Sequence, residues 1–409
     1  MAAAATPSPA QRARSGDAQA LAADLVASRR DTLRTFEAWE AALPSLAVPQ
    51  SDELNPPLWE LGHIGWFQSW WITRNPQRLM GWQADPEAPR SPAARADADA
   101  LYDSTRVAHA TRWSLPLPDA RTTRADLASQ QALTLDRLES TVPATARSLY
   151  FFRLALLHED MHHEAFLYMA QAVGVGINDP RWQPPSLPDP GPALTLAAGR
   201  AVLGATPGGE SFAFDNEYGR LETVIAAASI DRQVLRWSEY LPFAQAGGYE
   251  DPRWWTPAGW QWRQAHAQHG APRYLRRETG SWLQWQHGRW QSLDLHAPAC
   301  HLSLHEAQAW CHWAGRRLPT EAEWVAAQEQ GGDHFRWGDV WEWTASAFAP
   351  FPGFTPHPYR DYSAPWFDGR PVLRGASFMT QPRVRHPRYR NFFTPDRNDI
   401  AAGFRTCAV

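Results

Sequence analysis

The feature that most constrains the fold of this chain is a proline-rich stretch near its middle, "DPRWQPPSLPDPGPALTL", at residues 179–196. Proline fixes φ and lacks a backbone N–H, so such a run cannot continue a helix and is expected to form an extended, semi-rigid spacer. Helical periodicity dominates the sequence before it, and short strand-like runs dominate the sequence after it. We therefore predict an α+β protein with two domains joined at this spacer.

The first half predicts a four-helix bundle, occupying residues 17–178. Apolar residues return every three to four positions in four segments, at about 17–43, 57–74, 125–140 and 146–173. Residues 1–16 precede the first of these segments and are predicted to be disordered. The stretch 99–124 is too irregular for another bundle helix, and we expect a crossover that contributes to function.

The second half, residues 197–409, predicts a mixed domain rich in loops. It combines short strand-like runs, turn residues and most of the 23 tryptophans, which we expect to be mainly core. One helix is expected in "SLHEAQAWCHWA", with Ser303 as its N-cap and Glu306 completing a capping box.

The composition argues against several classes of binding partner and structural site. A formal net charge of -4 gives no general attraction to nucleic acid or to an anionic membrane. No stretch is long and apolar enough for a signal peptide or a membrane span, which predicts a cytoplasmic protein. The three cysteines have no C-x-x-C spacing, so neither a disulfide framework nor a cysteine-based zinc site is expected. A small-molecule partner is the remaining expectation.

A cluster of histidines suggests a metal site. His158 and His162 lie four residues apart in "HEDMHHE", so their imidazoles share one face of the predicted helix. His63, in "LWELGHIGWF" of the second helix, can add a third ligand across the bundle. Three neutral imidazoles leave coordination positions open on Fe(II), zinc or copper, as a catalytic site requires. Because His158 opens an HExxH motif, a zinc hydrolase with Glu159 as general base is an alternative.

The whole chain resembles the ergothioneine-type nonheme iron sulfoxide synthases. The members of this family combine a DinB-like helical bundle with a formylglycine-generating-enzyme-like (C-type-lectin-like) α+β domain. In this chain, the bundle is marked by the motifs "GHIGWF" and "HEDMHHE". The second domain is marked by the motifs "FAFDNE", "GGYEDPRWW", "RRLPTEAEWVAA", "GDVWEWTAS", "VLRGASF" and "RYRNFFTPDRNDIAAGFR". Within this family, "YDSTRVAHATRW" at 102–113 is similar to the branch that makes selenoneine.

The resemblance implies an Fe(II) ion held by His63, His158 and His162. The family uses O2 to join a sulfur or selenium donor to C2 of the imidazole of hercynine, which is trimethylated histidine. The "RNFF" run implies a substrate pocket, with Asn391 contacting hercynine. The implied substrate-binding set also includes the neighbours of Asn391 in this run, Arg390, Phe392 and Phe393. Two arginines of the crossover, Arg106 and Arg112, complete the set, because relatives have donor-binding arginines in that segment.

Two departures from the family pattern bear on the donor and on proton supply. Relatives that use γ-glutamylcysteine place Trp-Asp where this chain has Phe392 and Phe393, so the carboxylate that meets the ammonium of the donor is missing. This change favours a neutral seleno- or thiosugar, unless both phenylalanines are merely core. A tyrosine of the family is also replaced, because the corresponding run is "FAPFPGF". Water, or one of several other tyrosines, can supply the proton: Tyr102, Tyr359, Tyr362 or Tyr389.

The sequence thus favours C–Se bond formation between hercynine and a selenosugar, and leaves other functions open. A thiol donor such as cysteine or γ-glutamylcysteine would make the protein an ergothioneine-type enzyme. The second domain's fold also serves as a recognition scaffold, so a non-catalytic ligand-binding module is a further alternative. Copper-dependent formylglycine generation is disfavoured because "RGASFM" ends in Met379 rather than leading to paired cysteines.

Overall fold

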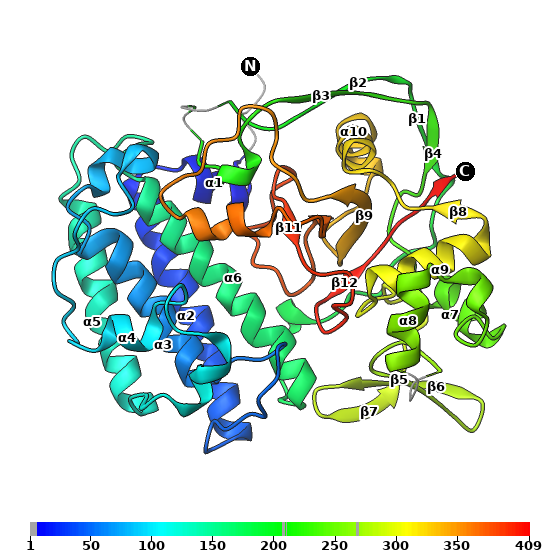
Figure 1. Cartoon of the computed structure of the whole chain (residues 1–409), viewed down its shortest axis with the longest axis horizontal. Coiled ribbons are helices and arrows are strands. Elements are labelled where there is room, and N and C mark those ends of the chain that lie inside the picture. Colours follow the sequence, from blue (N-terminus) through cyan, green and yellow to red (C-terminus); the bar gives the residue numbers. More distant parts are fainter. Residues whose placement is uncertain (1–5, 207–208, 210, 267–269) are drawn as a thin grey trace.

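The computed structural model describes residues 6–206, 209, 211–266 and 270–409. Figure 1 shows a helical half on one side and a mixed half on the other, with α6 along the boundary between them. The α+β fold class is confirmed. The four bundle helices are α2 (Ala18–Ala42), α3 (Pro57–Gln68), α5 (Ala120–Glu139) and α6 (Tyr150–Val173). α6 packs against both α2 and α3, so side chains on its two sides meet different partners.

The connections of the bundle are short helical pieces. α3 continues into a π-helical turn, Ser69–Thr73, and a 3-10 turn follows at Arg78–Gln83. The crossover predicted at 99–124 contains α4 (Ala98–Tyr102) and a 3-10 turn at His109–Ser114. α4 packs against α3, and the π-helical turn packs against α5 and α6.

The start of the chain differs from the sequence prediction. Disorder was expected up to residue 16, but Pro9–Ser15 form helix α1, which begins with a capping box at Ser8. The Arg14 side chain is fully buried, and its two terminal nitrogens donate to Glu217 at 2.7 and 2.9 Å. This tertiary ion pair orders a segment too short to show helical periodicity; residues 1–5 of the prediction lie outside the described residues.

The mixed half contains two four-stranded sheets. The first has the order β1 (Leu194–Leu196), β4 (Ala228–Ile230), β13 (Cys407–Ala408) and β8 (Arg316–Arg317). The second has the order β11 (Asn391–Phe392), β10 (Pro371–Gly375), β9 (Trp341–Ala347) and β12 (Ala402–Gly403). Because β1 already pairs with β4, the predicted spacer 179–196 ends earlier than expected, before Leu194.

Among the described residues, one two-stranded sheet, one three-stranded meander and four α-helices complete this half. The two-stranded sheet pairs β2 (Gly199–Leu203) with β3 (Leu221–Ile225), and the meander consists of β5 (Leu275–Glu278), β6 (Ser281–Gln286) and β7 (Arg289–Ser292). The predicted helix is α9 (Leu304–Ala314), with the Ser303 capping box in place. Three further helices were not predicted: α7 (Trp237–Gln245), α8 (Pro257–Ala265) and α10 (Glu321–Gly331).

The two halves share one continuous apolar core. Buried residues of α6 and α3 belong to the same cluster as buried residues of β9, β10 and the C-terminal loops. Polar contacts also cross the boundary, as in the bond from the Trp341 indole to Glu164 of α6. Within the described residues, no helix is long and apolar enough to cross a membrane.

Candidate metal centre and active site

Three histidine side chains converge between α3 and α6. Ring nitrogens of His63, His158 and His162 all lie within 4.8 Å of one another. Nε2 of His158 and Nε2 of His162 are 3.1 Å apart. Two nitrogens at about 2.1 Å from one ion and at right angles to each other would be about 3 Å apart, so the spacing suits a shared metal. Among the described residues, this is the one group of histidine, cysteine, aspartate and glutamate side chains that meets this distance criterion.

Hydrogen bonds fix the tautomers of two of these rings. Nδ1 of His63 lies 2.8 Å from the backbone oxygen of Tyr102, and Nδ1 of His162 lies 2.6 Å from Oε1 of Glu60. A carbonyl or a carboxylate can only accept, so both Nδ1 atoms carry the proton and both Nε2 lone pairs stay free. Such outer partners orient histidine ligands in metal sites.

Aromatic rings hold the histidines in place. The Trp59 ring stacks on His63, with centroids 4.8 Å apart, and the Phe67 ring stacks on His158 with centroids 3.4 Å apart. Nδ1 of His158 is buried without a hydrogen-bond partner. The His158 ring is therefore oriented by packing rather than by a polar contact.

Burial keeps two of the rings neutral. The pKa values of His63 and His158 lie well below the usual range, first because burial disfavours the imidazolium and then because His162 adds a nearby like charge. Neutral imidazole is the form that binds a metal ion. The orphaned His158 nitrogen, the free Nε2 atoms and the neutral rings together fit a divalent transition metal.

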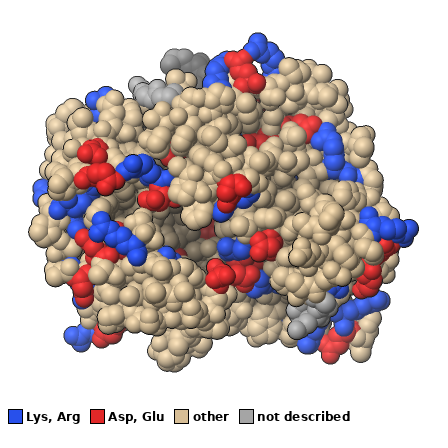
Figure 2. Space-filling model, in the orientation of Figure 1, with Lys and Arg blue, Asp and Glu red and all other residues tan. Residues whose placement is uncertain are grey.

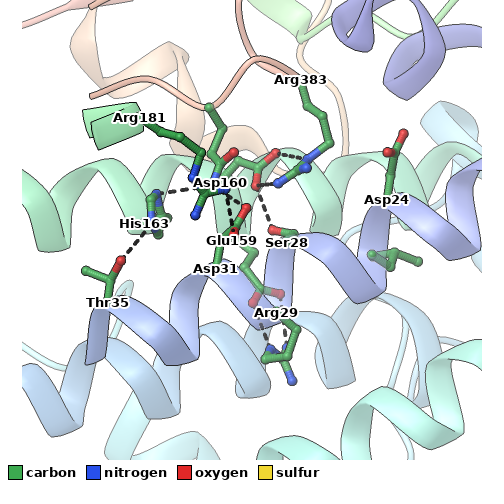
Figure 3. A network of polar contacts seen from close by, with 12 residues as sticks. Asp24, Ser28, Arg29, Asp31, Thr35, Glu159, Asp160, His163, Arg181 and Arg383 are labelled. Atoms are coloured by element: carbon green, nitrogen blue, oxygen red, sulfur yellow. Dashed lines mark hydrogen bonds and ion pairs between the residues drawn. The ribbon is translucent and has the colours of Figure 1, made fainter. Parts of the chain in front are cut away.

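The opposite face of α6 has a structural role. Figure 3 shows Glu159 and Asp160 directed toward α2 and the C-terminal half. Glu159 accepts from Arg29 at 2.7 and 3.0 Å, and the two side chains are 2% and 3% exposed. Asp160 pairs with Arg383. Because Glu159 is committed to this ion pair, it is not placed to act as the general base of a zinc hydrolase.

His163 lies on the same side as these acids. Its Nε2 is 2.9 Å from the Thr35 hydroxyl, and its Nδ1 is 3.3 Å from the Gln381 amide. This is the placement that the helical register predicts for a residue one step after His162.

A cleft opens beside His162, at the boundary of the two halves. Its empty volume, open mouth included, is about 850 Å³. Figure 2 shows a surface hollow at this boundary, with charged side chains of both signs near its rim. The lining combines polar groups with many aromatic side chains: Asn55, Glu60, Met161, His162, Glu164, Ala165, Tyr168, Trp341, Tyr362, Tyr389, Asn391, Phe392, Phe393 and Ile400.

The structure brings three of the predicted substrate residues to this cleft. Asn391, Phe392 and Phe393 all line it, together with His162 and Glu164 of α6. Oδ1 of Asn391 accepts from the Phe392 backbone N–H at 2.9 Å, which leaves the Asn391 amide N–H₂ free to donate into the cleft. The Phe392 ring stacks on Phe348, with centroids 4.2 Å apart, and so has both a packing role and an accessible edge.

The three arginines predicted to bind substrate lie in different surroundings. Arg390 is 1% exposed, is bound to Glu321 at 2.7 and 3.0 Å and lies outside the cleft lining, so the structure does not bring its guanidinium to the substrate. A buried guanidinium needs a carboxylate partner, and Glu321 supplies it. Arg106 is largely exposed and pairs with Asp103.

Arg112 lies next to the cleft. It donates to Oδ1 of Asn55 at 2.8 Å, and its guanidinium carbon is 3.7 Å from the centre of the Trp59 ring that stacks on His63. Burial lowers its pKa from the ordinary arginine value. This contact with Trp59 connects the crossover to the metal centre.

Two of the four candidate tyrosines line the cleft. The hydroxyls of Tyr362 and Tyr389 are 2.8 Å apart, and the Tyr389 hydroxyl lies 3.0 Å from the sulfur of Met161, which precedes His162. Burial raises the pKa of both tyrosines, so both are neutral donors. Tyr359 packs edge-on against His158, with centroids 6.0 Å apart, whereas Tyr102 contributes its backbone oxygen to His63.

Sequence reasoning missed Glu60 and Glu164, the two charged residues of the cleft lining other than histidine. Glu60 comes three residues before His63 on the same helix, a spacing that places both on one face and that was an available signal. Glu164 receives bonds from Trp341, Ser377 and Thr380, which are distant in sequence, so no local pattern marks it.

Comparisons with known proteins agree with this architecture. The model of the "Sulfatase-modifying factor enzyme 1-like domain" family matches residues 188–339 and 336–408. The chain is 31% identical to the hercynine oxygenase of Mycolicibacterium smegmatis, over 95% of this chain and 98% of the relative. The chain belongs to the hercynine oxygenase family. The corresponding protein of Mycobacterium tuberculosis is 32% identical over 94% of this chain and 97% of its own.

Membership of this family confirms the broad family prediction, while the selenoneine branch stays a prediction. A formylglycine-generating enzyme of Streptomyces coelicolor is 28% identical over 27% of this chain, about half of that relative's length. The three cysteines are buried, and none belongs to the metal-capable group found among the described residues. The structure therefore gives no support to the copper-dependent alternative.

Proposed function

We propose that this protein is an O2-dependent nonheme Fe(II) enzyme that forms a C–Se bond between C2 of the hercynine imidazole and a selenosugar. Full-length similarity to proteins named hercynine oxygenase supports hercynine as substrate and an oxidative reaction. The observation that carries the proposal is that one cleft is lined by His162, a member of the three-histidine group, and by Asn391, Phe392 and Phe393.

His63, His158 and His162 would hold the iron. When bound, Fe(II) supplies the electrons and the open coordination positions that O2 chemistry requires. The remaining roles belong to the chain itself. Glu60 holds the Nδ1 proton of His162, and the Tyr102 carbonyl holds that of His63, so the Nε2 atoms stay directed at the same point.

The walls of the cleft would orient hercynine and exclude water. The free N–H₂ of Asn391 is a donor for the substrate, and aromatic side chains give a low-dielectric enclosure. Tyr168, Tyr362 and Tyr389 supply the hydroxyls of the lining, and those of Tyr362 and Tyr389 are paired. We propose this pair as the proton source that stands in for the missing family tyrosine.

The far wall of the cleft supports a sugar donor. Phe392 and Phe393 present rings where an ammonium-bearing donor would need a carboxylate, and C–H faces of a sugar pack on such rings. Arg106 is exposed and outside the lining, so it adds no cationic contact for the carboxylates of a peptide thiol.

A competition assay tests the donor and the reaction together. The Fe(II)-loaded protein is given hercynine, a 1-selenosugar, the matching 1-thiosugar and γ-glutamylcysteine under air, and products are identified by mass. We expect preferential consumption of the selenosugar with loss of hercynine. Preferred consumption of γ-glutamylcysteine would instead assign the protein to the ergothioneine branch, and unchanged hercynine would refute the proposal.

A further inference from the structure

The carboxylate of Glu164 is fixed at one oxygen and open at the other. Its Oε1 accepts three hydrogen bonds, from the Trp341 indole at 2.8 Å, the Ser377 hydroxyl at 2.6 Å and the Thr380 hydroxyl at 2.9 Å. No described residue donates to Oε2, and Oε2 is not among the buried atoms that lack a partner. Since Glu164 lines the cleft, Oε2 faces the space where a substrate would bind.

Among the described residues, no arginine forms an ion pair with Glu164; Asp215 and Glu306 are also buried without such a pair, but neither lines this cleft. Several other buried carboxylates each pair with an arginine, and Figure 3 shows two such pairs. These pairs are Glu159 with Arg29, Asp160 with Arg383, Glu217 with Arg14, Glu321 with Arg390 and Glu342 with Arg405. Taking a carboxylate out of water without a cation is costly, so an unpaired one facing a cleft points to a cation supplied from outside.

The neighbouring arginine does not fill this role. The guanidinium of Arg385 lies close enough to act electrostatically on Glu164, but it donates to the backbone oxygens of Thr380 and Phe378, at 3.0 and 3.4 Å. The lining of the cleft contains no arginine, and its two carboxylates are Glu60 and Glu164. Glu60 is bonded to His162 through Oε1 and its Oε2 is buried, so Glu164 is the carboxylate of the lining whose second oxygen is neither bonded to a described residue nor buried.

Three aromatic side chains of the cleft lining lie near Glu164. Trp341 donates to Glu164 directly, and the Tyr389 ring lies against Trp341 with centroids 5.5 Å apart. Tyr168 follows Glu164 by four residues, so both are on the same face of α6 and both line the cleft. The negative faces of aromatic rings attract cations, and quaternary ammonium groups, which have no N–H to donate, are recognised in this way.

We propose that Glu164, with Trp341, Tyr389 and Tyr168, forms a binding site for the quaternary ammonium group of the substrate. The inference rests on the proposed function, because hercynine carries a trimethylammonium group. Glu164 and His162 both line the cleft, so one molecule bound there can place its imidazole at the histidines and its ammonium at Glu164. Glu164 would then select trimethylated over uncharged imidazole compounds.

The test measures binding without turnover. Calorimetry on the Fe(II)-loaded protein without O2 compares hercynine with 3-(imidazol-4-yl)propanoate, which has the imidazole and carboxylate but no ammonium. Glu164→Gln keeps an oxygen acceptor for the three donors and removes the charge. We expect the Kd of hercynine to rise about tenfold or more, the order expected for loss of a charged contact, while the Kd of the analogue changes less than about threefold.

Further variants separate charge from packing. Glu164→Asp keeps the charge and should recover part of the preference for hercynine over the analogue. Tyr168→Leu should raise the Kd of hercynine more than the Kd of the analogue. Glu139→Gln, at an exposed site at the end of α5, is the control for charge removal and should bind both ligands as the wild type does.

Three outcomes would refute this binding site. They are an unchanged hercynine Kd in Glu164→Gln, an equal rise in the Kd of hercynine and of the analogue, or a larger rise in the Kd of γ-glutamylcysteine than in that of hercynine. The last result would assign the carboxylate to the donor. Tetramethylammonium serves as a separate probe. If the wild type binds tetramethylammonium but not hercynine, and Glu164→Gln no longer binds tetramethylammonium, the cation site is supported and the proposed substrate is refuted.

Discussion

Removing the charge of Glu159 should destabilise the fold without removing the metal ligands. The Glu159–Arg29 pair is almost fully buried and bidentate, and Arg29 is further bonded to the Leu127 carbonyl at 2.9 Å and the Gln68 amide oxygen at 3.3 Å. Glu159→Gln leaves the guanidinium buried with only neutral acceptors. Breaking a buried ion pair in this way costs about 3–5 kcal/mol, a large part of the roughly 5–15 kcal/mol that stabilises a typical domain.

The assay is denaturant-induced unfolding of the wild type, Glu159→Gln and the double variant Glu159→Leu/Arg29→Met. Replacing both charges by apolar groups of similar size should recover most of the loss, because no buried charge is then left unpaired. Iron bound per chain should stay at the wild-type level in the folded fraction, since the ligands lie on the other face of α6. A Glu159→Gln protein within about 1 kcal/mol of the wild type, but without catalytic activity, would contradict this reasoning and favour a general base.

Three further changes test the site. Alanine in place of any one of the three ligand histidines should reduce bound iron to background in metal analysis and abolish hercynine consumption; His163→Ala, the matched control, should keep its iron and lose about 1–3 kcal/mol of stability. Glu60→Gln should weaken Fe(II) affinity by roughly 10- to 100-fold in an anaerobic titration, because the His162 ring loses its anionic partner; unchanged affinity would remove Glu60 from the metal centre. Phe393→Asp should lower the kcat/KM ratio of selenosugar to γ-glutamylcysteine, and an unchanged ratio would show that this position does not contact the donor.

The helical half of the site was predictable because its signals are local. The spacing of His158 and His162 within one helix, and the apolar periodicity of α3 around His63, both follow from 3.6 residues per turn. The same helical register places His163, one residue after His162, on a different face of α6, where it contacts Thr35 of α2. Helix α9 was predictable for a similar reason, because its capping box lies within four residues.

The parts that sequence did not reveal depend on contacts between distant segments. Glu164 meets Trp341 across 177 positions, and Arg14 of α1 meets Glu217 across 203 positions. Arg390 was assigned to the substrate-binding set because it adjoins Asn391. Its guanidinium is buried, however, and a buried charge needs a partner of opposite sign, which Glu321 provides. Helices α7 and α8 are short, and tertiary packing decides such segments more than intrinsic propensity does. Helix α10 is as long as α9 and has a capping box of the same kind, from Thr320 and Glu323, so its local signal was available and was missed.

The most direct test of the central claim compares metals in one protein. The metal-free chain is loaded anaerobically with Fe(II) or with Zn(II), and hercynine consumption under air is followed with a selenosugar present. We predict O2-dependent loss of hercynine with Fe(II), no loss with Zn(II), and no loss with Fe(II) when O2 is withheld. Equal activity of the zinc-loaded protein, or peptide hydrolysis with zinc and no hercynine consumption with iron, would contradict it.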